Sequence, residues 1–124
     1  PRYLQKALAG GSIVIYGDGT QSRDFVYISD VVAALVSAAT ATGINRQVIN
    51  IGSGVETAVN ELIACIETVN GRSVNRIHNT EKSGGVTRLV ADISRARALL
   101  GYRPQISLKK GIKLTLKQDE RFSN

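Results

Sequence analysis

The segment GDGTQSRDFVYISD, residues 17–30, decides how this sequence is interpreted. It opens with Gly17-Asp18-Gly19, whose two glycines allow a tight turn and a close approach of the backbone to a ligand. Arg23 follows, directly before an aromatic stretch that predicts a short strand. An arginine fork pairs with two phosphate oxygens and stays charged at any pH at which proteins fold. The segment therefore indicates either a pyrophosphate contact by Arg23 or a surface turn in which Arg23 pairs with Asp24 or Asp18.

Helices and short strands alternate on both sides of this segment. Apolar residues at helical spacing predict helices, and β-branched runs closed by glycine predict strands. Ser29 or Asp30 is expected to cap the second helix. The predicted helices cover residues 1–9, 29–40, 57–70, 94–100 and 108–118, and the predicted strands cover 12–16, 24–28, 47–51 and 74–78. This alternation predicts an α/β or α+β fold.

The run Gln47–Ile51 is a continuous β-branched stretch, which is typical of a strand buried on both faces. Such a strand needs neighbours on both sides, and three or four short strands supply a poor independent sheet. We therefore expect a partial mixed sheet with flanking helices, belonging to a larger protein. The loop Gly52-Ser53-Gly54 follows this run. Two interpretations stay open for it: its backbone amide groups bind an anion, or it is only a turn between a strand and a helix.

Composition narrows the classes of function. The 124 residues carry a net charge of +6, but the basic residues are scattered and no aromatic residues alternate with them, so a small phosphate-bearing ligand is favoured over nucleic acid. The longest apolar stretches reach about half the length of a membrane span, so no membrane segment is expected. The single cysteine, Cys65, predicts a buried inert thiol and a reducing, cytoplasmic environment. His78 lacks partners at metal-binding spacing, so we expect a structural role for it and no metal site.

The spacing in residues 17–31 resembles the segment G-D-G-x-Q-x-R-D-F-x-Y-V-x-D-V of nucleotide-sugar epimerases and dehydratases. These belong to the extended short-chain dehydrogenase/reductase family, typified by UDP-glucose 4-epimerase. Four further segments follow in the order of that family, so the resemblance covers essentially the whole chain: VINIGSG at 48–54, VNELI at 59–63, ADISRARALLGYRP at 91–104 and SLKKGIKLTL at 107–116.

The resemblance implies an organisation and a binding site. In this family an NAD-binding Rossmann half is followed by a smaller C-terminal half that holds the nucleotide sugar, and residues 1–124 correspond to that C-terminal portion. Arg23 is expected to grip the diphosphate, with help from Gln21 in the same loop. Asp30 is expected to be a helix cap rather than a ligand group. The uracil pocket is expected to be lined by Val14, Ile15 and Tyr16.

One stretch departs from the family pattern. The family commonly has R-x-G-D before the segment that begins at Ala91, with the arginine on phosphate and the aspartate on ribose. Here residues 82–85 read KSGG. Lys82 still offers a charge for the substrate but no bidentate fork, and Gly85 offers no carboxylate. The loss of one ribose hydrogen bond would cost on the order of 1 kcal/mol, which weakens binding without abolishing it.

The catalytic features of the family are missing from these residues. No tyrosine is followed by lysine four positions on, and there is no glycine fingerprint for a dinucleotide. We therefore expect the chain alone to be inactive and to belong to an NAD-dependent UDP-sugar epimerase or dehydratase that acts through a 4-keto intermediate, with NAD bound by the N-terminal part. A homo-oligomer is expected. Two alternatives stay open, namely a non-catalytic binding or assembly module, and a dehydratase or decarboxylase of another nucleotide sugar.

Overall fold

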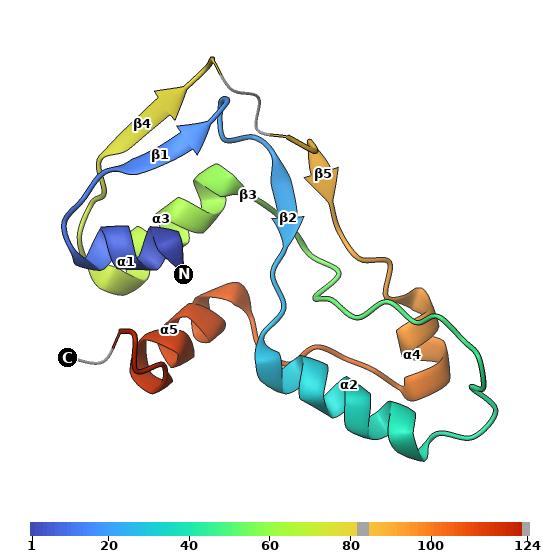
Figure 1. Ribbon diagram of the computed structural model, residues 1–124. Helices are drawn as coiled ribbons and strands as arrows, with labels where there is room; N and C mark the ends of the chain where they lie inside the picture. The colour runs from blue at the N-terminus through green and yellow to red at the C-terminus, as the bar shows by residue number, and fades with distance from the viewer. Residues whose placement is uncertain (82–84, 123–124) are drawn as a thin grey trace.

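Two small sheets are joined by helices that gather at the two ends of the molecule (Figure 1). The structure is a computed structural model that describes residues 1–81 and 85–122. The order of elements is α1 (Arg2–Leu8), β1 (Ile13–Tyr16), β2 (Ser22–Asp24), α2 (Ile28–Thr40), β3 (Glu56–Ala58), α3 (Val59–Asn70), β4 (Arg76–Asn79), β5 (Arg88–Leu89), α4 (Ser94–Leu100) and α5 (Leu108–Gln118). α1, α3 and α5 lie together at one end, while α2 and α4 lie at the other.

The strands form one parallel pair and one mixed sheet. β1 pairs with β4 in parallel, with Ile13 opposite Arg76. In the other sheet β2 is central, antiparallel to β3 and parallel to β5. The expected α/β class with a partial mixed sheet is confirmed. The central position of β2 matters for the site, because Arg23 is the middle residue of this strand.

The hydrophobic core is divided into clusters along the molecule. In β1 the burial alternates, as a strand with one covered face requires. Ile13 and Ile15 pack against Val59 and Ile63 of α3. A second cluster joins α1, α3 and α5, and a third holds α2 against α4 around the buried Tyr102. The clusters near β1 fix the strand that bears three of the predicted site residues, Val14, Ile15 and Tyr16.

Two predictions about the second strand and helix are wrong. The strand predicted at 24–28 lies at Ser22–Asp24 instead, and α2 begins directly afterwards at Ile28. Its N-cap residue is Tyr27, so neither Ser29 nor Asp30 caps the helix. Asp30 is instead buried and accepts the backbone N–H groups of Gln105 and Ile106, at 3.1 and 3.0 Å. Its carboxylate ties the start of α2 to the link between α4 and α5, which the sequence pattern did not reveal.

The predicted strand 47–51 pairs with no strand of the described chain. Its backbone runs past α4, and Val48 is 79% exposed. A β-branched run forms a strand only where a neighbour supplies hydrogen-bond partners, and none of residues 1–81 and 85–122 does so here. The prediction of a paired, buried strand therefore fails within this chain.

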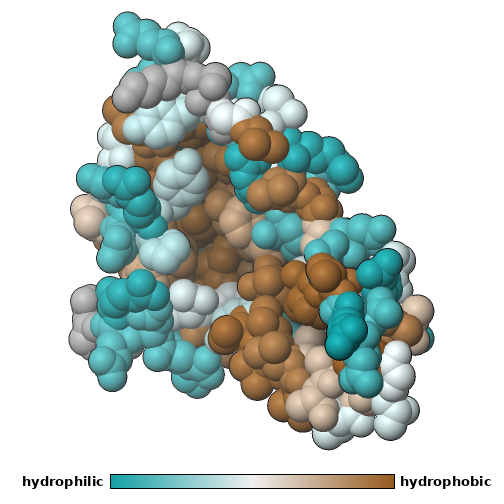
Figure 2. All heavy atoms as spheres, turned by 45° about the vertical axis from the view of Figure 1, so that its right-hand side comes forward, coloured by the Kyte–Doolittle hydropathy of each residue, from teal (hydrophilic) through white to brown (hydrophobic). Residues whose placement is uncertain are grey.

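An apolar stripe on α2 is left uncovered. Ile28, Val32, Leu35 and Val36 are each at least half exposed, and Figure 2 shows hydrophobic atoms gathered over the part of the molecule where α2 lies. Exposed apolar patches of this kind mark contact surfaces. No helix among residues 1–81 and 85–122 combines the length and hydrophobicity needed to cross a bilayer.

Cys65 is partly buried on α3 rather than fully buried. Burial raises the pKa of its thiol, against a smaller opposing effect of Lys109. A raised pKa keeps the sulfur protonated and poorly nucleophilic, in line with the inert thiol expected from the sequence.

Candidate substrate-binding site

An open groove of about 670 Å³ lies between α1, the exposed face of β1, and β2. Its volume is in the range of small-molecule sites, which run from about 300 to 1,000 Å³. Val14, Tyr16 and Arg23, three of the residues predicted to bind substrate, line this groove together. Phe25 lines it as well. The groove thus brings aromatic and aliphatic side chains to the same place as a guanidinium group.

Arg23 is held by backbone carbonyls rather than by a carboxylate. Its Nη1 donates to the carbonyl oxygens of Ser22 and Val86, both at 2.7 Å. Within the described residues, no ion pair joins Arg23 to Asp24 or Asp18, so the alternative of a surface ion pair does not describe this structure. A cation held by neutral partners keeps its full charge for a ligand.

The glycine turn before β2 is locked to the start of α3. The backbone N–H of Asn60 donates to the Gly19 carbonyl at 3.1 Å, and the Asn60 side-chain amide donates to the Asp18 carbonyl at 3.0 Å. Gly19 has φ of +79°, and a Cβ there would collide with the side-chain amide of Asn60. Only glycine fits this close contact, which sets the position of the turn relative to Arg23.

Gln21 is used inside the fold. Its Nε2 donates to the Tyr16 carbonyl at 2.8 Å, which ties the loop to the end of β1. Gln21 does not line the groove. His78 of β4 also contacts the glycine turn, because its Nδ1 atom lies 3.1 Å from the Gly17 carbonyl oxygen. This arrangement fits the structural role expected for the histidine.

A further predicted site residue, Ile15, does not line the groove. The Ile15 side chain is fully buried against α3, because alternate residues of a strand point to opposite faces. Its side chain therefore cannot contact a ligand that lies on Val14 and Tyr16. Lys82 lies outside the described residues.

Asp24 organises the loop that was expected to present amide groups to an anion. Its Oδ1 accepts hydrogen bonds from the Ser53 N–H (2.8 Å) and hydroxyl (2.5 Å), and its Oδ2 accepts from the N–H groups of Gly54 (2.9 Å) and Ala91 (3.3 Å). Burial raises the pKa of Asp24, but these hydrogen bonds together outweigh it and hold the pKa below its ordinary value. The anion for the Gly52-Ser53-Gly54 amides is therefore Asp24 itself.

The groove residues that the sequence reasoning missed include Phe25, Arg2 and Lys6. For Phe25 the signal was its place directly after the Arg-Asp pair. For Arg2 and Lys6 the only available signal was their spacing of four positions, which puts them on one face of α1. Nothing in the sequence relates that face to Arg23, because α1 and β2 meet only in the folded chain.

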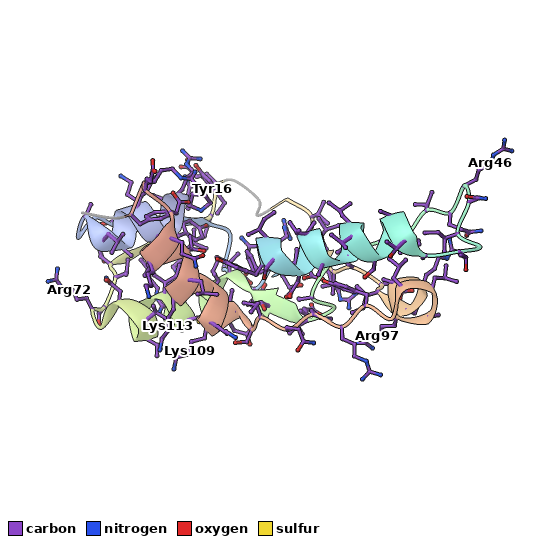
Figure 3. All side chains as sticks on the ribbon, turned by 90° about the horizontal axis from the view of Figure 1, so that it is seen from below. Tyr16, Arg46, Arg72, Arg97, Lys109 and Lys113 are labelled. Atoms are coloured by element: carbon purple, nitrogen blue, oxygen red, sulfur yellow. The ribbon has the colours of Figure 1, made fainter. Side chains whose placement is uncertain are left out.

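Other basic side chains project from separate parts of the molecule (Figure 3). Arg46 extends from the loop after α2, Arg97 from α4, and Lys109 and Lys113 from α5, whereas Tyr16 lies near α1 at the opposite end from Arg46. A nucleic-acid surface needs basic groups gathered along one path. The scatter of these basic positions gives no support to a nucleic-acid surface.

The mixed α/β fold, with its glycine turn and Arg23, matches the C-terminal part of Rossmann-type nucleotide-sugar epimerases. The chain belongs to the GDP-mannose 4,6 dehydratase family, whose family model matches residues 1–115.

Characterised relatives and a solved structure agree with this assignment. The chain is 37% identical over 114 residues to UDP-glucose 4-epimerase of Mycolicibacterium smegmatis, covering 92% of this chain and 36% of the relative. It is 35% identical over 116 residues to UDP-glucuronate 4-epimerase of Thermodesulfobacterium geofontis. That match covers 93% of this chain and 35% of the relative. UDP-glucuronic acid 4-epimerase from Bacillus cereus, solved with UDP-glucuronic acid and NAD, superposes with a TM-score of 0.88 at 32% identity, covering 98% of this chain and 39% of that one.

The chain therefore spans a little over a third of the length of the relatives it matches. The prediction of an epimerase/dehydratase portion is confirmed, as is the use of NAD within the family.

Proposed function

We propose that residues 1–124 form the substrate-binding portion of an NAD-dependent UDP-sugar epimerase that acts through a 4-keto intermediate. The observation that carries the proposal is the groove shared by Val14, Tyr16 and Arg23. The epimerases reported above are named for UDP-sugar substrates, and each matches at least 92% of this chain. Within the groove, Val14 and Tyr16 receive the flat uracil ring and Arg23 pairs with the diphosphate.

The residues present do not fit NAD. A dinucleotide cradle needs a glycine-rich turn that leads from a strand into a helix. The Gly17–Gly19 turn leads from β1 into β2 instead, and the amides of the Gly52–Gly54 loop are engaged by Asp24. We propose that NAD binds to a part of the protein outside these residues. The role of this chain is to hold the substrate, and the chain alone should be inactive.

The proposal is tested by calorimetry of the full-length protein with UDP, dTDP, GDP and CMP, each with and without its sugar. UDP and UDP-sugars are expected to bind most tightly. A preference for GDP or dTDP would favour a dehydratase of another nucleotide sugar. The absence of binding by any of these nucleotides would contradict the proposal and favour the assembly-module alternative.

We further propose a homo-oligomer and a cytoplasmic location, the latter because a lone cysteine suits a reducing compartment.

The chain 1–124 made alone is expected to associate through the apolar stripe of α2, because Leu35 and Val36 are 65% and 61% exposed. Light scattering should show a mass that rises with concentration. The double substitution Leu35→Lys and Val36→Lys should lower the measured mass towards that of the monomer. The control substitution Lys110→Glu on α5 should leave the measured mass unchanged. A monomer at all concentrations would contradict this expectation.

A further inference from the structure

We infer that Arg2 and Lys6 of α1 bind a second phosphate of the ligand, separate from the one held by Arg23. This inference rests on the proposed function, because it concerns how the same groove distinguishes a diphosphate from a monophosphate. The guanidinium of Arg23 is already partly used, and the groove contains further cations with no competing carboxylate.

The hydrogen bonds of Arg23 limit what it can hold. A guanidinium has five N–H donors, and both hydrogens of Nη1 are directed to the carbonyls of Ser22 and Val86. Nε and Nη2 remain, and they have no hydrogen-bond partner among the described residues. These two nitrogens form one fork, which matches two oxygens of a single phosphate. A diphosphate therefore needs a second cation for its other phosphate.

Arg2 and Lys6 of α1 line the same groove and supply that cation. They lie four positions apart, so they share one face of α1, while Leu4 and Ala7 face the core. Both line the groove that Arg23 lines, and no aspartate or glutamate does. Within the described residues neither side chain takes part in an ion pair or a side-chain hydrogen bond. Both charges are therefore available to a ligand.

The surroundings strengthen the attraction. The groove is floored by apolar side chains of α1 and α3, including Leu4, Leu62 and Ile66. Charges of one sign along low-dielectric walls add their potentials, so an anion with two charges gains more there than an anion with one. The three cations thus favour nucleoside diphosphates and their sugars over monophosphates. Lys82, the expected second cation, lies outside the described residues and is not needed for this arrangement.

The test compares UDP with UMP by calorimetry on the full-length protein. Arg2→Ala with Lys6→Ala is expected to weaken UDP about tenfold or more, the loss of a charge-assisted contact, and Arg23→Ala is expected to do the same. UMP has one phosphate and can use only one of the two phosphate contacts. Its affinity should therefore fall either in the Arg2/Lys6 double variant or in Arg23→Ala, but not in both. The matched control is Lys109→Ala with Lys113→Ala, a pair of exposed lysines at the same spacing on α5, which should change neither affinity.

The outcomes separate this inference from the proposed function. If Arg23→Ala weakens UDP but the α1 double variant does not, the inference is wrong and the function stands. If UMP weakens equally in both variants, the assignment to separate phosphates is wrong. If the wild type binds neither nucleotide, the proposed function fails and the inference fails with it. Should the alanine pair fold poorly, Arg2→Gln with Lys6→Gln gives the same comparison, and Arg2→Lys with Lys6→Arg should retain most UDP affinity.

Discussion

Arg23→Ala in the full-length protein is expected to weaken UDP binding by about 1 to 3 kcal/mol, the range for a charge-assisted hydrogen bond. Arg23 lines the groove that contains Val14 and Tyr16, and only its Nη1 is used by backbone carbonyls, so alanine removes both the charge and the remaining fork. Isothermal titration calorimetry of UDP with wild type and variant measures the difference.

Two further variants make this measurement specific. Arg23→Lys keeps a charge but loses the fork, and it should fall between wild type and alanine. Arg97→Ala removes an exposed arginine of α4 that projects away from the groove, and it should bind UDP as wild type does. Because Arg23 also bonds the Val86 carbonyl, thermal unfolding of each variant should be recorded. Unchanged UDP affinity in a folded Arg23→Ala protein would rule out the assigned role.

Asp24→Asn is expected to lower the free energy of unfolding by about 2 kcal/mol or more. The carboxylate accepts four hydrogen bonds, and asparagine would turn an NH₂ group towards at least one of the donors. Leaving buried donors unpaired costs about 1 to 3 kcal/mol, and bonds to a charged group lie at the upper end. Urea unfolding monitored by circular dichroism gives the difference between wild type and variant.

The effect of Asp24 should depend on pH in a defined direction. Its pKa in the folded state lies below the ordinary value of 3.8. A lowered pKa contributes stability above the unfolded pKa and loses it as the pH falls through the folded pKa. The difference in the free energy of unfolding between wild type and Asp24→Asn should therefore be largest at pH 7 and should shrink below about pH 4.

Asp92→Asn is the matched control for this substitution. The Asp92 carboxylate is exposed and accepts a bond from the Ser94 N–H two residues along. Its replacement should have a much smaller effect than that of Asp24, since solvent can replace the lost bond. Equal effects of the two substitutions would show that the links from Asp24 to the 52–54 loop and to Ala91 do not stabilise the fold.

Local patterns predicted the helices well. α4 and α5 lie at the residues predicted: Ser107 caps α5 by accepting the Lys110 N–H, and Gly101, with φ of +61°, ends α4. The cap predicted at Ser94 is wrong, because Ile93 is the N-cap residue of α4 and Ser94 is its first helical residue. α3 ends before Gly71 as expected, although its first two predicted residues belong to β3. Helices are specified by contacts within a few residues, so the sequence carries that information directly.

Strands and polar contacts were predicted less well, since their partners lie far away in the chain. The run 47–51 has the composition of a buried strand but finds no paired neighbour among the described residues. Asp30 reads as a cap yet binds backbone groups 75 and 76 positions away. Asp24 likewise reads as a partner for Arg23 but binds residues 29 to 67 positions along the chain.

The sequence by itself determined the family and the glycine turn, and it singled out Arg23 for the proposed phosphate contact, because these depend on ordered motifs. Only the tertiary structure decided that Val14, Tyr16 and Phe25 share a groove with Arg23, that Ile15 faces the core, and that Arg2 and Lys6 line the same groove. The physical reason is that a binding site is made where separate elements pack together. α1 and β1 pack against α3 through hydrophobic contacts, β2 is joined to the start of α3 by its pairing with β3, and no local pattern records that arrangement.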